Sequence, residues 1–170
     1  MHPLFIIAAG VGTALLLRLL RTAKAAKNLK YQLRRIQVYR FRTSEPIVFR
    51  VFVDFTNLEP TPITVKQLYL DIFLNFGNAE NPNFQRIGTL NTDNIPVTIP
   101  ANQTVSKSFD VSVPWVNLGA AAVKILMGFA TTGRASWPTE AKVEGQLKAV
   151  GFTIPVSVTV PFDSNNVNNQ

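Results

Sequence analysis

Residues 68–75 have the sequence LYLDIFLN, in which a leucine or isoleucine occupies every second position. A period of two places these four aliphatic side chains on one face of a β-strand. The stretch therefore predicts a strand with one strongly apolar face, which has to pack against a second layer. It indicates a mainly β fold.

The same alternation recurs on both sides of this stretch. Residues 36–42 and 47–55 flank the turn composition TSEP at 43–46, which predicts a strand pair. Further strands are predicted over residues 85–90, 95–99, 104–113, 141–150 and 153–162, with a loop over 77–84. Residues 116–130 differ, because their apolar side chains recur at helical spacing and Gly133 and Pro138 follow. Seven or eight strands with one inserted helix predict an antiparallel β-sandwich.

Charge is concentrated ahead of this body. Residues 1–43 contain nine basic side chains and no acidic one, whereas the remainder contains eight basic and ten acidic residues. The N-terminal quarter thus carries +9 and the remainder −2, which together give the formal net charge of +7. A block of one sign beside an apolar segment is typical of a chain that meets a membrane surface, a polyanion or an acidic protein.

An apolar run precedes most of these charges. Residues 4–17 are fourteen uncharged residues, and continuing to Leu20 gives a stretch at the lower edge of what spans a bilayer. The run fits a membrane helix, a helix buried among protein neighbours, or an interfacial anchor. Basic residues follow the run, which argues against a cleaved secretory signal and places the C-terminal body inside if the run spans a membrane. The predicted anchor residues are Leu4, Phe5, Ile6, Ile7, Leu15, Leu16 and Leu17.

The basic segment has high helix propensity. Residues 18–34 contain no Pro or Gly, so we predict one long helix over residues 1–34. At 100° per residue one side forms a packing seam of Leu19, Ala23, Ala26, Leu29 and Leu33. The opposite side carries Arg18, Arg21, Lys24, Lys27, Arg34 and Arg35. This basic side meets solvent, anionic lipid headgroups, nucleic-acid phosphate or an acidic protein surface.

A family resemblance rests on short motifs in the body. An apolar strand ends in Asn57, before Pro60 and Pro62. Later, IPA at 99–101 leads into an alternating strand, and VEGQL at 143–147 lies near the close. Over about residues 33–162 this order resembles the late-embryogenesis-abundant type 2 family, also called WHy-like. The usual Asn-Pro-Asn is replaced by NLEP at 57–60. The resemblance implies a binding or protective β-sandwich, often behind a transmembrane helix, with no catalytic site to transfer.

Residues typical of catalysis are sparse. The single histidine is His2, and the sequence has no cysteine, no Gly-rich phosphate loop and no nucleophile elbow. Asp54 and Asp71 lie in predicted strands and are expected to be structural or solvated carboxylates. Trp115 and Trp137 flank the predicted helix and are expected to cap the core. We expect no enzymatic activity, no cofactor, no metal site and no small-molecule substrate.

The sequence thus divides into an anchor helix (residues 1–34), a sandwich domain (35–162) and a polar tail (163–170). We expect a non-enzymatic structural protein of a multi-component assembly, with a virion, such as that of a membrane-containing phage, as its setting. Its expected partners are other protein subunits and a lipid bilayer, with anionic lipid or nucleic-acid phosphate at the basic helix. The alternative is a cellular single-pass membrane protein of the LEA type 2 kind, acting in stress protection or lipid handling. Either way the chain is expected at a membrane.

Overall fold

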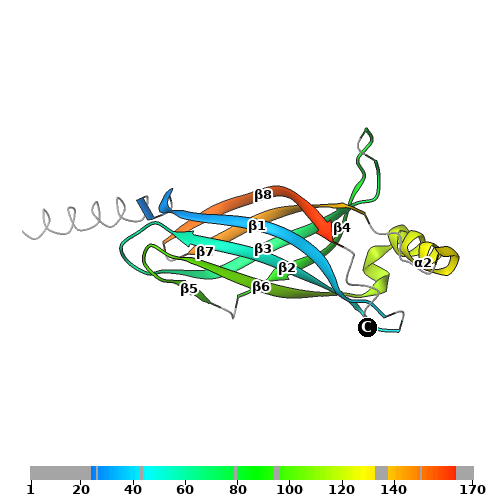
Figure 1. Ribbon diagram of the computed structural model, residues 1–170, viewed down its shortest axis with the longest axis horizontal. Helices are drawn as coiled ribbons and strands as arrows, with labels where there is room; N and C mark the ends of the chain where they lie inside the picture. Colours follow the sequence, from blue (N-terminus) through cyan, green and yellow to red (C-terminus); the bar gives the residue numbers. More distant parts are fainter. Residues whose placement is uncertain are drawn as a thin grey trace, which may run out of the picture.

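The computed structural model describes residues 24–25, 27–42, 44–78, 80–93, 96–132, 138–149 and 151–163, as drawn in Figure 1. Strands account for most of these residues. In chain order the elements are β1 (Leu29–Arg40), β2 (Ile47–Asn57), β3 (Ile63–Asn75), β4 (Phe84–Asn91), β5 (Val97–Ile99), β6 (Thr104–Val113), the 3₁₀ helix η1 (Trp115–Leu118), α2 (Ala120–Thr132), β7 (Glu140–Ala149) and β8 (Phe152–Asp163).

The strands form one strongly curled sheet in the order β4-β3-β7-β8-β1-β2-β6, with β5 paired to β3. Curling brings the two outer strands, β4 and β6, face to face. A Cβ built on Gly88 of β4 would lie 3.0 Å from Cγ2 of Val113 in β6. The result is a sandwich-like body whose two layers share one core (Figure 1).

The core confirms the alternation that indicated the fold. Leu68, Leu70, Ile72 and Leu74 of β3 are all buried, and the side chains between them, Tyr69, Asp71 and Phe73, are half-buried. On the opposite layer β2 contributes Phe49, Val51, Val53 and Phe55. Burial of aliphatic and aromatic side chains from both layers is the main stabilising contribution in such a fold.

The predicted long N-terminal helix is wrong over residues 29–34. Lys24, Ala25, Lys27 and Asn28 are helical, but β1 begins immediately afterwards at Leu29. Pairing with β2 and burial in the core outweigh the high helix propensity of this segment, as tertiary context commonly does. The rest of the predicted helix, and the apolar run 4–17, lie outside the described residues.

The sheet is mixed, whereas the sequence predicted a purely antiparallel sandwich. β1 pairs antiparallel with β2 but parallel with β8, through the pairs Ile36 with Phe162 and Gln37 with Asp163. This short parallel bridge joins the two layers into one sheet. It arises because β8, the last strand, inserts beside β1, the first.

The inserted helix is confirmed, in two pieces. The segment begins with η1 and continues as α2, separated by Gly119 at φ 52°. Glycine is the residue that tolerates this left-handed backbone conformation, so the break falls where the chain can turn. The predicted strand pair around residues 43–46 and the loop between β3 and β4 are confirmed as well.

The body has two ends, named here for the direction of β1. The proximal end holds the start of β1, the β2–β3 turn and the start of β6. The distal end holds the end of β1, η1 and α2 (Figure 1). The 12 residues of β1 separate the two ends by about 40 Å at the rise of an extended strand.

Candidate interaction surface

The predicted packing seam does not form a helical stripe. Leu29 and Leu33 lie in β1 and are buried in the sandwich core, next to Ile36 and Val38. Leu19, Ala23 and Ala26 lie outside the described residues. The two leucines therefore stabilise the body itself and are not available to a partner.

The predicted basic face is also divided by the start of β1. Arg34 and Arg35 lie at a bulge in β1, where the pairing with β2 shifts by one residue. The Arg34 Nε lies 2.6 Å from Oδ2 of Asp54, and the Arg35 guanidinium lies 3.8 Å from Oδ2 of Asp163 and 4.8 Å from the ring centre of Phe52. Both arginines thus pair within the body, although they remain half exposed or more.

The remaining predicted contacts to anionic partners lie before β1. Lys24 and Lys27 are exposed in the helical turns that precede the strand. Arg18 and Arg21, like the anchor residues Leu4, Phe5, Ile6, Ile7, Leu15, Leu16 and Leu17, lie outside the described residues. Lys24 and Lys27 therefore lie on the segment that leads into the body, whereas Arg34 and Arg35 belong to the body itself.

A polar clamp holds the proximal end. Asn57 is fully buried at the end of β2; its Nδ2 donates to the carbonyl oxygens of Thr61, Ile99 and Pro100, and its Oδ1 accepts from the backbone N–H of Glu59. The Glu59 carboxylate accepts from the Asn28 side chain. The backbone N–H of Leu58 donates to the Asn28 carbonyl at 3.0 Å. The chain segment that enters β1 is thereby fixed to the β2–β3 turn.

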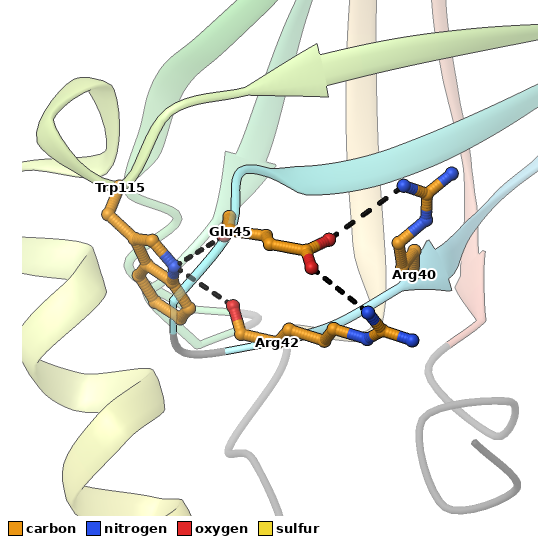
Figure 2. A network of polar contacts seen from close by, with 4 residues as sticks. All are labelled: Arg40, Arg42, Glu45 and Trp115. Carbon is orange, nitrogen blue, oxygen red and sulfur yellow. Dashed lines mark hydrogen bonds and ion pairs between the residues drawn. The ribbon is translucent and has the colours of Figure 1, made fainter.

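A second network holds η1 at the distal end (Figure 2). The indole Nε1 of Trp115 donates to the backbone carbonyl oxygens of Glu45 at 2.9 Å and Arg42 at 3.2 Å. The Glu45 carboxylate pairs with Arg42 at 2.9 Å and with Arg40 at 3.9 Å. The Trp115 ring meets Phe41 edge to face, with ring centres 5.6 Å apart. Trp115 thus joins η1 to the β1–β2 turn and packs against the core; Trp137 lies outside the described residues.

Beyond this network, the distal end exposes apolar side chains. Leu118 and Ile125 turn inward and are buried, and they attach η1 and α2 to the core. Val116 is 82% exposed, Val123 57% and Met127 62%. Leu58, at the proximal end, is the remaining large hydrophobic residue exposed among the described residues. Three of the four therefore gather on η1 and α2.

The composition of α2 explains this outward face. Its sequence AAAVKILMGFATT contains one charged residue, Lys124. A surface helix of an isolated domain normally presents charged and polar side chains to water. Helical spacing predicted the helix, whereas the lack of a polar side is the signal that would have indicated the outward apolar face.

The aspartates in the strands are each paired with an arginine. Asp71 lies 2.7 Å from a guanidinium nitrogen of Arg86 and accepts a hydrogen bond from Thr89 at 2.7 Å. Burial raises the pKa of Asp71, but the hydrogen bonds from Thr89 and Arg86 and the charge of Arg86 outweigh it and hold the pKa below its ordinary value. Such a carboxylate stays ionised near neutral pH and is a structural group. Within the described residues no group of three His, Cys, Asp or Glu side chains could hold a metal ion.

A hollow of about 500 Å³ lies along the seam between β6 and the β4–β5 segment. Two of its charged lining residues pair with each other, because Arg50 makes two hydrogen bonds to Asp110, at 2.7 and 2.9 Å. The Arg50 guanidinium also lies 3.4 Å from the ring centre of Tyr39. Arg50 and Asp110 are therefore committed to contacts within the body.

Comparison with known proteins gives no family. No family model and no curated protein matches the chain. Similar solved structures include a protein of Archaeoglobus fulgidus (11% identity, 78% of this chain and 90% of that one, TM-score 0.46) and a protein of Arabidopsis thaliana (17% identity, 78% and 76%, TM-score 0.40). A sporulation control protein of Bacillus subtilis is also similar (10% identity, 81% and 49%, TM-score 0.39). With TM-scores below 0.5, none bears on what this chain binds. The LEA type 2 resemblance stays a prediction.

The longest helix within the described residues is α2, with 13 residues. In that part of the chain, no helix is both long and apolar enough to cross a membrane. The predicted anchor run at residues 4–17 is not among the residues described.

Proposed function

We propose that the chain is a non-enzymatic structural subunit of a multi-component assembly, held by its N-terminal segment and making protein contacts through the distal end of its sandwich. The observation that carries this proposal is the exposure of Val116, Val123 and Met127 on η1 and α2. Val123 and Met127 are four residues apart and lie on one side of α2, and an apolar patch on a protein surface marks an interaction site.

The two networks support the same reading. The Trp115 network fixes η1 to the body, so the exposed apolar side chains on η1 and α2 begin from a fixed position. The Asn57 clamp fixes the opposite end, where the N-terminal segment enters β1. Preorganised surfaces bind with a smaller loss of conformational entropy, as a subunit contact requires.

The setting is proposed from the sequence alone. A virion that contains a membrane combines a lipid-facing or protein-facing anchor with a small body that makes protein contacts. The competing proposal is a cellular single-pass protein of the LEA type 2 kind, whose sandwich acts as a monomer in stress protection or lipid handling.

A density gradient of native material, with and without mild detergent, tests the proposal. The full chain should co-migrate with a dense particle, and the double variant Val123→Glu/Met127→Glu should move to the light fractions. The control Thr153→Glu/Thr159→Glu adds the same charge at two exposed strand positions, opposite Lys148 and Lys142, and should co-migrate like the native chain. Flotation of the native chain with light membranes would instead favour the cellular single-pass protein. Unchanged migration of Val123→Glu/Met127→Glu would show that the distal end is not the contact.

A further inference from the structure

The apolar side of α2 needs a partner of matching length and chemistry. α2 has 13 residues, about 20 Å at the helical rise. Its exposed apolar residues Val123 and Met127 are four apart, so they lie on one side of the helix, and Ala120 precedes them at the helical spacing of three. A partner helix of about this length, apolar on its facing side, would cover the stripe.

The same chain contains one segment of that description. Residues 4–17 carry no charge, and as a helix these fourteen residues would be about 21 Å long. The run is apolar in every direction, and such a helix is stable only when it is surrounded by lipid or protein. Ala8, Gly10, Gly12 and Ala14 would let it approach another helix closely.

Residues 4–17 lie too far along the chain from α2 of the same molecule to dock on it. The run reaches β1 through residues 18–28, eleven residues that span at most about 40 Å when fully extended. That full extension would only match the length of β1, which separates the proximal end from α2. Lys24, Ala25, Lys27 and Asn28 are helical, however, and a helix advances only about 1.5 Å per residue. The segment therefore cannot fold back onto its own α2 with those residues helical.

We propose that the apolar run 4–17 of one molecule docks on the exposed side of η1 and α2 of a second copy, head to tail. The proposal rests on the proposed function and names the occupant of its contact surface. A contact between two different surfaces of the same chain is heterologous, so repetition builds a ring or an open filament and not a closed pair.

The test uses two full-length variants that each lose one half of the contact. Ile7→Asp/Leu15→Asp disables the run, and Val123→Glu/Met127→Glu disables the distal surface. Each should be monomeric by analytical ultracentrifugation, with association weakened about 100-fold or more because a buried unpaired charge is so unfavourable. Mixed in equal amounts, they should form a dimer and nothing larger, since one intact junction remains. The native chain should form longer oligomers that persist in 1 M NaCl, because the contact is apolar.

Two matched measurements separate the possible failures. Thr153→Glu/Thr159→Glu should associate like the native chain, and circular dichroism should show that every variant is folded. If only Val123→Glu/Met127→Glu disrupts association, the distal end contacts a different surface of the second copy: the proposed function stands and the contact with residues 4–17 is wrong. If neither variant changes association, both are wrong. If the native chain is monomeric yet binds neutral phosphatidylcholine vesicles through residues 4–17, the run is a lipid anchor and the head-to-tail contact is wrong.

Discussion

Replacing Asn57 with alanine should be among the most destabilising single changes in this body. The side chain is fully buried and makes four hydrogen-bond contacts at 2.8 to 3.2 Å. Its two amide protons serve three carbonyl oxygens, so the contacts amount to about three full hydrogen bonds, each with a net value of about 1 kcal/mol. Alanine would also leave the Glu59 N–H and the Ile99 carbonyl buried without this partner, which costs about 1 kcal/mol or more.

We therefore expect Asn57→Ala to lower the free energy of unfolding by about 3–5 kcal/mol. Urea denaturation followed by circular dichroism measures this directly, and the melting temperature should fall by about 10 °C. Asn91→Ala is the matched control, because Asn91 is exposed and its hydrogen bonds to Gln67 and Asp93 lie at the surface. That variant should change stability by less than about 0.5 kcal/mol. A loss below about 1 kcal/mol for Asn57→Ala would refute the view that this amide clamps the proximal end.

Three further changes probe other parts of the structure. Gly145→Ala should destabilise the body by about 2 kcal/mol or more, because Gly145 has φ 158° and an added Cβ would lie 2.0 Å from the Tyr69 carbonyl oxygen; urea denaturation measures the loss. Asp71→Asn should lower stability by about 1 kcal/mol at pH 7. Because the folded pKa of Asp71 lies below its unfolded value, the stabilisation is fully present above about pH 4 and lost as pH falls through the folded pKa, so native chain and variant should converge in urea titrations at low pH. Trp115→Phe removes the donor to two carbonyl groups and should speed amide hydrogen exchange in η1 and α2, while exchange in β3 stays unchanged.

The start of β1 shows why a pattern can indicate two structures. Leu29 and Leu33 are four residues apart, which places them on one side of a helix and equally on one face of a strand. The next inward residue, Ile36, is three residues on, a helical spacing that the strand accommodates with its bulge at Arg34 and Arg35. Pairing with β2 and β8, which lie far along the chain, decides between the two structures. The local sequence of β1 does not encode these pairings.

Whether other features could be predicted depends on how far apart in the sequence the residues that determine them lie. The alternation in β3 needs only local periodicity, and it predicted both the strand and its buried face. The parallel pairing of β1 with β8 depends on how the last strand returns to the first, which no local pattern encodes. The outward side of α2 lies between these cases, because its single charge, Lys124, is visible in the sequence but its position at the distal end is not.

The place of β1 in the sheet has a mechanical consequence. β1 is hydrogen-bonded on both sides, to β2 and to β8, and the N-terminal segment enters it directly from the proximal end. Tension between that segment and a contact at the distal end would run along the strand, across ladder bonds that lie roughly perpendicular to it in the antiparallel pair with β2. These bonds would be loaded together in shear and would not open one after another. Under such tension the sandwich would act as a mechanical link between whatever holds its first residues and whatever meets α2.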